Sequence, residues 1–236
     1  LGGLVGSEMC IRDSPMLILS MFVPFILWAL MHLLFPFLET LVMEQWSVNI
    51  SPYFNQAAIF FLMLIPMMMG MVYGFILLDE RDAGVITAIS VTPTGKSGYL
   101  KLRMGIPLLL SMVFIICYLL LLGLTGNLGI LQLAVISLLV SSQSLILLLF
   151  LGAFAQNKVM GMAISKGFGI LLMGPLFDYA LPQPYNWIGS YSPLYWASRS
   201  LLSDSPGSFW LYSGITFLFH LLLIWILFRK FTARSD

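Results

Sequence analysis

The chain has 236 residues, of which 60% are hydrophobic and only 9% are charged, and its mean hydropathy is +0.98. A soluble globular domain typically carries about 25% charged residues, so this composition excludes that class. The net charge of +1 and the lack of a basic run in the sequence argue against a nucleic-acid partner. We therefore expect one all-α integral membrane domain.

Residues 1–14 have the sequence LGGLVGSEMCIRDS. The codons ATG TGT ATA AGA GAC can encode Met9 to Asp13, and this DNA resembles a transposase adapter used in shotgun sequencing. A secretory signal would begin with positive charge followed by an apolar core, and neither precedes Pro15. We predict that residues 1–14 are a non-native, adapter-derived segment and that residues 15–236 form the membrane domain.

Six apolar segments follow, and most are about long enough to cross a bilayer at ~1.5 Å rise per residue. The fifth is short unless it begins within the loop before it. The predicted spans are Pro15–Leu38, Ala57–Leu78, a third that starts between Gly98 and Gly105 and ends by Leu124, Ile130–Ala155, Gly167–Leu181 and Phe209–Phe228.

The composition of three connections between these spans predicts their structure. Residues 39–56 contain Glu39, Glu44 and scattered apolar positions, which suggests a short helix lying at the membrane interface. Residues 155–166 are expected to form a short charged loop. Residues 182–208 are rich in Tyr and Trp, which favour the membrane interface, so this segment is predicted to be interfacial and partly re-entrant.

The distribution of charge predicts the orientation of the chain. Six spans place both ends on one side of the membrane, and Arg199 is the only basic residue expected on the opposite face. By the positive-inside rule, both termini are predicted to be cytoplasmic, in an inner-membrane protein that crosses several times. The basic residues on the predicted cytoplasmic face are Arg81, Lys96, Lys101, Arg103, Lys158, Lys166, Arg229, Lys230 and Arg234.

The loop from Asp79 to Arg103 holds seven of the chain's 21 charged residues and separates spans two and three. Asp79 or Asp82 could cap a short helix at its positive N-terminus. Such a helix, apolar on one side, could dock a soluble partner or merely rest on lipid headgroups. The other residues predicted to form this docking segment are Glu80, Arg81, Gly84, Val85, Ile86, Ile89 and Pro93, which ends the helix.

Motifs for catalysis are absent from the sequence. Thr94 to Ser97 resembles the end of a P-loop, but position 90 is Ser where that motif requires Gly. No nucleophile-elbow or zinc-protease motif is present, and Cys10 and Cys117 give no disulfide or metal framework. We predict no catalytic residue, no metal ligand and no cofactor in this chain.

One ionisable residue lies near the middle of span six. His220 at that depth is a functional hypothesis by default, and the polar part of span four, including Ser141 and Gln143, could face it. This group is our candidate intramembrane polar site. Two alternatives therefore remain open beside a transport subunit: an intramembrane enzyme that uses His220, and a carrier or scaffold of another class.

The loop resembles that of type-2 ATP-binding-cassette (ABC) export permeases. These permeases carry acidic residues, a glycine, an apolar stretch and a proline between spans two and three, here Asp79–Glu80, Gly84, Val85–Val91 and Pro93. They also carry a Ser-Pro-Leu with aromatic residues before the last span, here Ser192, Pro193, Leu194, Tyr195 and Trp196. Segments such as YGFILLDERDAG are similar to permeases labelled as fluoroquinolone exporters.

The resemblance implies a fold, partners and a coupling site. It implies six spans with cytoplasmic ends, a second permease chain, identical or different, and two separate cassette ATPase subunits that hold ATP and Mg²⁺. The 79–93 segment would then couple these ATPases to the spans, and the 192–196 segment would lie at the outer face. Family members usually begin with an interfacial helix, so its absence fits a missing native start.

Overall fold

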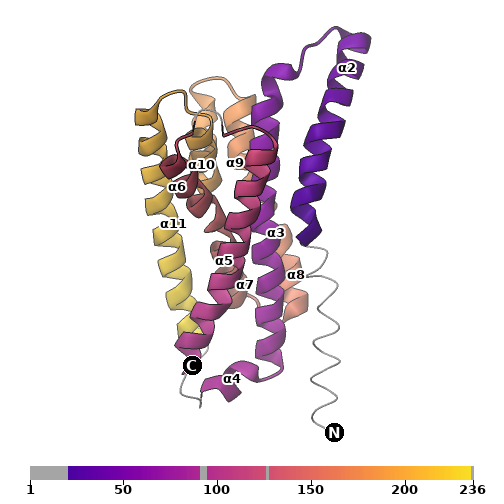
Figure 1. Cartoon of the computed structure of the whole chain (residues 1–236). Helices are drawn as coiled ribbons and strands as arrows, with labels where there is room; N and C mark the ends of the chain where they lie inside the picture. Colours follow the sequence, from indigo (N-terminus) through magenta and orange to yellow (C-terminus); the bar gives the residue numbers. More distant parts are fainter. Residues whose placement is uncertain (1–20, 91–94, 126–127, 235–236) are drawn as a thin grey trace.

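The computed structural model describes residues 21–90, 95–125 and 128–234. Every regular element in these ranges is helical, and no strand occurs within them. Six helical stretches among these residues are long and apolar enough to span a membrane, which confirms the predicted all-α fold with six spans (Figure 1); the cytoplasmic placement of both termini stays a prediction. These stretches are Met21–Trp46, Ser51–Asp82, Gly98–Leu121, Ile130–Phe154, Lys158–Ala180 and Pro206–Ala233.

The elements of the described residues are named as in Figure 1. In chain order they are the π-helical turn η1 (Leu30–Leu34), α2 (Phe35–Trp46), the 3₁₀ turn η2 (Ser51–Tyr53), α3 (Phe54–Asp82), α4 (Val85–Ser90), α5 (Gly95–Leu121), α6 (Ile130–Ser141), α7 (Gln143–Phe154), α8 (Lys158–Lys166), α9 (Gly169–Ala180), the 3₁₀ turn η3 (Tyr185–Tyr191), α10 (Pro193–Leu201) and α11 (Pro206–Arg234).

The helix α3 is the centre of the bundle. Two-thirds of its apolar window is buried, as is that of the α6–α7 span, whereas other spans bury a third or less. Gly70 and Gly74 lie one turn apart on α3, and each lacks the Cβ that would collide with α7. Small residues at this spacing let two membrane helices approach closely. The two glycines therefore set the distance between α3 and α7.

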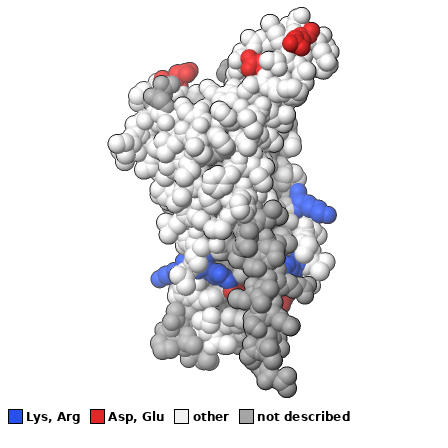
Figure 2. Space-filling model, turned by 45° about the vertical axis from the view of Figure 1, so that its right-hand side comes forward, with Lys and Arg blue, Asp and Glu red and all other residues white. Residues whose placement is uncertain are grey.

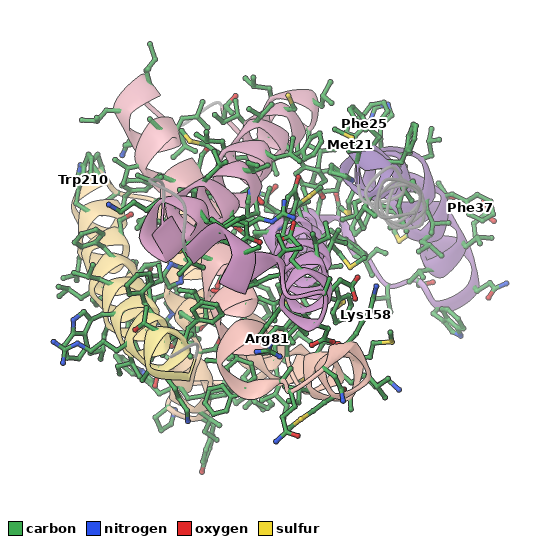
Figure 3. The ribbon with its side chains drawn as sticks, turned by 90° about the horizontal axis from the view of Figure 1, so that it is seen from below. Met21, Phe25, Phe37, Arg81, Lys158 and Trp210 are labelled. Carbon is green, nitrogen blue, oxygen red and sulfur yellow. The ribbon has the colours of Figure 1, made fainter. Side chains whose placement is uncertain are left out.

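The first span stands apart from the other helices. The helix that begins by Met21 continues through η1 and α2 to Trp46, and Ser47 ends it in the left-handed conformation at φ 54°. The predicted interfacial helix in residues 39–56 is therefore wrong, because residues 39–46 extend the first span as a helix. None of the residues of α2 is buried, and Figure 3 shows Met21, Phe25 and Phe37 on a helix set away from the bundle.

The predicted loop at 155–166 is also largely helical. Asn157 caps α8, accepting a hydrogen bond from the backbone N–H of Met160 at 2.9 Å. The helix α8 then leads through Gly167 and Phe168 into α9, so the fifth span runs from Lys158 to Ala180. The prediction missed this because the Asn and two Lys residues suggested a solvated loop, although one of them is a helix cap.

The two ends of the bundle differ in charge. The α4 end, which carries α4 and the start of α8, is at the bottom of Figure 1, and the far end carries η3 and α10. Figure 2 shows Lys and Arg on the lower half of the visible face, with acidic groups beside them and further acidic groups at the top. The basic residues visible on this face therefore lie toward the α4 end, whereas acidic residues occur at both ends.

Candidate functional site

The acidic residues of the charged loop belong to the end of α3. This helix continues to Asp82, and Ala83 and Gly84 form a turn in which Gly84 adopts φ +73°. Such a conformation suits glycine because it has no Cβ. The proposed capping of the loop helix by Asp79 or Asp82 is therefore wrong: both residues lie in the last turn of α3, before the turn into α4.

Two consecutive acids at this end contact two different helices. The carboxylate of Asp79 lies 2.5 Å from Nζ of Lys158, at the start of α8. Glu80 pairs with the guanidinium of Arg103, whose Nε lies 2.8 Å from its Oε2, and it also accepts a hydrogen bond from the hydroxyl of Tyr99. Both contacts of Glu80 come from α5, so adjacent residues of α3 contact α8 and α5.

The next residue, Arg81, contacts the end of α7. Its guanidinium donates hydrogen bonds to the carbonyl oxygens of Gly152 at 3.1 Å, Ala155 at 2.7 Å and Gln156 at 2.8 Å. The last carbonyls of a helix lack partners within it and carry partial negative charge, so a guanidinium satisfies both needs. Figure 3 shows Arg81 between the ribbon of α3 and those of α7 and α8.

The helix α4 is attached to this ion-paired end of α3. Val85, Ala88 and Ile89 share one face at helical spacing; Ala88 is exposed and the two larger residues are half-buried. Among the proposed coupling residues, Asp82 is exposed, the side chain of Ile86 is not described, and Pro93 lies outside the described residues. The site is thus a short helix whose described apolar residues are half-buried or, at Ala88, exposed, attached to the end of a helix that contacts three others.

The intramembrane polar site brings His220 to the break in the fourth span. The helices α6 and α7 meet at Ser142, and the Oγ of Ser142 lies 2.6 Å from Nδ1 of His220. This hydroxyl is also 2.6 Å from the carbonyl of Leu139. The predicted residues Ser141 and Gln143 flank this contact, and in the part of the chain that the structure describes neither is hydrogen-bonded to His220.

Several polar groups near this break are buried. The hydroxyl of Ser141 donates to the carbonyl of Leu138 at 2.9 Å, whereas both amide atoms of Gln143 and Nε2 of His220 have no partner among the described residues. Buried polar groups of this kind normally bind protein atoms or ordered water. No group of three or more His, Cys, Asp or Glu residues in the described ranges is arranged to hold a metal ion.

The far-end segment folds as two short helices against α9. Ser192 begins α10 as its N-cap and Pro193 occupies the first turn, a position where proline costs no hydrogen bond. Tyr195 is fully buried, and the indole of Trp196 donates to the carbonyl of Ser190 at 3.1 Å. The interfacial or re-entrant placement of these residues stays a prediction.

Sequence reasoning missed an ion pair at this end. Arg199 donates hydrogen bonds to Asp178 from Nε at 3.1 and 3.0 Å and from Nη2 at 2.8 Å. These bonds raise the pKa of Arg199 above its ordinary value, and its guanidinium lies 4.7 Å from the ring of Tyr195. The signal available in the sequence was that Arg199 is the one basic residue expected at this end.

The comparisons with known proteins decide the class of protein. The family described as "Fluoroquinolones export permease protein Rv2686c-like" matches residues 8–228. The chain belongs to this family. The curated relatives include the fluoroquinolones export permease proteins Rv2686c and MT2760 of Mycobacterium tuberculosis, strains ATCC 25618 / H37Rv and CDC 1551 / Oshkosh. Each is 26% identical over 226 residues, which cover 94% of this chain and 89% of the relative. No solved structure matches the chain.

Family membership confirms the coarser predictions. This fluoroquinolone export permease family protein is a multi-pass protein of the inner membrane, with six apolar helices among its described residues. The family assignment is consistent with a transport subunit. The roles of individual site residues, the partner chains and the nucleotide stay predictions.

Proposed function

We propose that this chain is the membrane subunit of an ATP-driven exporter of the type-2 ABC class. It moves drug-like, amphipathic molecules outward across the inner membrane. Separate cassette ATPase subunits hold ATP and Mg²⁺, and a second permease chain completes the transport path. The names of the curated relatives support a fluoroquinolone-like substrate.

The observation that carries this proposal is the connection of α4 to the end of α3, which contacts three other helices. A force applied to α4 reaches α3 through the short Ala83–Gly84 turn. From the end of α3 it passes to α8 through Asp79, to α5 through Glu80 and to α7 through Arg81. Ion pairs and packed helices of this kind carry motion as a unit. A soluble partner bound to α4 would therefore move four helices together.

The Ser142–His220 contact is the specific observation that favours an enzyme instead. A hydroxyl bonded to an imidazole is the beginning of a nucleophile–base pair. Such a pair also needs a group that orients the imidazole, and Nε2 of His220 has no partner among the described residues. The contact is better explained as two buried polar groups that satisfy each other at a broken helix.

The direction of transport requires both termini in the cytoplasm. We expect that Gln156→Cys at the α4 end and Glu44→Cys at the far end, each exposed, react with an impermeant maleimide from opposite sides. The background is Cys10→Ser with Cys117→Ser. In intact spheroplasts only the cysteine at position 44 should label, and lysis should expose position 156. Labelling of position 156 before lysis would reverse the proposed orientation.

The partnership itself is tested by purification. We expect a cassette-type ATPase encoded beside this gene to copurify with the tagged permease in mild detergent, because α4 offers it a docking face. A Walker A lysine variant of that ATPase is the control, since it should still bind the permease while losing hydrolysis. Recovery of the permease without any ATPase, at equal membrane abundance, would refute the partnership.

A further inference from the structure

A cavity of about 460 Å³ opens at the far end of the bundle. Its wall is formed by the far-end parts of α3, α5, α6, α10 and α11, by Gly123, Leu124 and Leu128 between α5 and α6, and by the segment that joins α10 to α11. Sites for small molecules usually measure about 300–1,000 Å³. The cavity is therefore large enough for a drug-sized molecule, and the site described above does not include it.

The lining of the cavity is amphipathic. Ile59, Leu119 and Phe209 contribute apolar surface and are almost completely buried, with exposed fractions of 3% or less. Asn55 and Asp204 line the same cavity and are exposed to solvent. A ligand that suits this lining has an apolar body for the buried residues and a polar group for the exposed ones.

The charge of the cavity selects the sign of that polar group. Asp204 is the one charged residue among the described residues that line the cavity. Its carboxylate forms no ion pair within the part of the chain that the structure describes. A carboxylate attracts an organic cation and repels an anion of the same shape. The cavity therefore favours positively charged ligands.

Arg199 does not cancel this charge. A neighbouring cavity shares the residues around Asp204 and is also lined by Arg199. The guanidinium of Arg199 is hydrogen-bonded to Asp178, at 2.8 Å from Nη2 to Oδ1, and only 16% of its side chain is exposed. The opposite charges of such a bidentate pair offset each other. The negative charge of Asp204 therefore remains available to a ligand.

We propose that the far-end cavity binds an amphipathic organic cation, with Asp204 as its counter-ion. The inference rests on the proposed function in one respect: with cytoplasmic termini, this cavity faces outward and holds the cation after it leaves the membrane path. Binding at this site does not require the ATPase. The permease alone can therefore test it, separately from export.

The test uses two ions of nearly the same shape and opposite charge, tetraphenylphosphonium and tetraphenylborate. The purified permease in nanodiscs is equilibrated with each ion, and binding to empty nanodiscs is subtracted. We expect saturable binding of tetraphenylphosphonium and weaker binding of tetraphenylborate. Asp204→Asn should weaken binding of the cation by up to about fivefold, the upper end of the range for a solvent-accessible ion pair. Asp204→Lys should shift the preference toward the anion by about tenfold or more.

Two control variants separate the site from the general charge of the far end. Glu44→Lys makes the same change of net charge at an exposed far-end residue outside the cavity lining, and it should leave both affinities unchanged. Asn55→Trp should obstruct the cavity and weaken both ions. If Asp204→Lys and Glu44→Lys change binding equally, or if the wild-type permease binds neither ion above empty nanodiscs, the proposed site is refuted. If the permease binds the cation as expected but recruits no ATPase, the proposed exporter function is refuted and the cation site is not.

Discussion

Replacement of Gly70 by alanine is expected to destabilise the bundle more than any other small change in α3. A Cβ at Gly70 would lie 2.5 Å from the carbonyl oxygen of Ser144 and 2.9 Å from its Cα. Both are backbone atoms of α7, which cannot rotate away as a side chain could. The helices must separate, and overpacking of this kind costs about 1–3 kcal/mol. We expect a lower melting temperature in detergent and reduced abundance in the membrane.

The matched controls are Gly105→Ala in α5 and Gly214→Ala in α11. A Cβ at either position meets nothing within 4 Å, and alanine favours a helix over glycine by about 1 kcal/mol. These variants should therefore melt at the parent temperature or above it. If Gly70→Ala melts with them, α3 and α7 are not held at the distance that the structure shows.

The sequence alone could predict the number of spans because long apolar runs have few alternatives in a membrane. It could not show where the first helix ends or where the fifth span begins. Glu39 and Glu44 suggested an interface, yet both lie within α2, which continues to Trp46. Asn157 and Lys158 suggested a loop, yet they begin α8. Helix ends and loops contain the same types of polar residue. Only the backbone conformation shows whether such a residue belongs to the helix or to the loop.

The contacts of the charged residues in the candidate site could not be predicted from the sequence. The charged run Asp79–Arg81 attracted attention as a surface for a partner, and the structure shows all three residues bonded within the chain. These contacts join residues more than 18 positions apart, and no local pattern encodes such pairs. The far-end cavity was missed for the same reason, because its lining comes from four separate stretches of the chain.

The second large effect is expected at α4. The double variant Val85→Asp with Ile89→Asp places two carboxylates on the face that is proposed to dock the ATPase. Burial of each apolar side chain contributes roughly 1.5–3 kcal/mol, and an unpaired buried carboxylate costs more. We expect the ATPase to be lost from the purified complex. The six spans should still insert, because α4 lies outside them.

A control must add two negative charges at the same end without removing apolar surface. Gln156→Asp with Asn157→Asp does so, since both side chains are exposed and aspartate caps a helix about as well as asparagine. The carbonyl of Gln156, which Arg81 binds, is unchanged by the substitution. This control should retain the ATPase, so that any loss in the α4 variant is due to its docking face.

The most direct measurement is ATP-driven uptake of a fluoroquinolone into inside-out membrane vesicles that contain the permease and its ATPase. The parent and the Gln156→Asp, Asn157→Asp control should accumulate the drug with ATP and not with a non-hydrolysable analogue. The Val85→Asp, Ile89→Asp variant should fall to the level of vesicles without permease, at equal membrane abundance. Equal ATP-driven uptake by this variant and the parent would contradict the proposal that α4 couples ATP hydrolysis to transport.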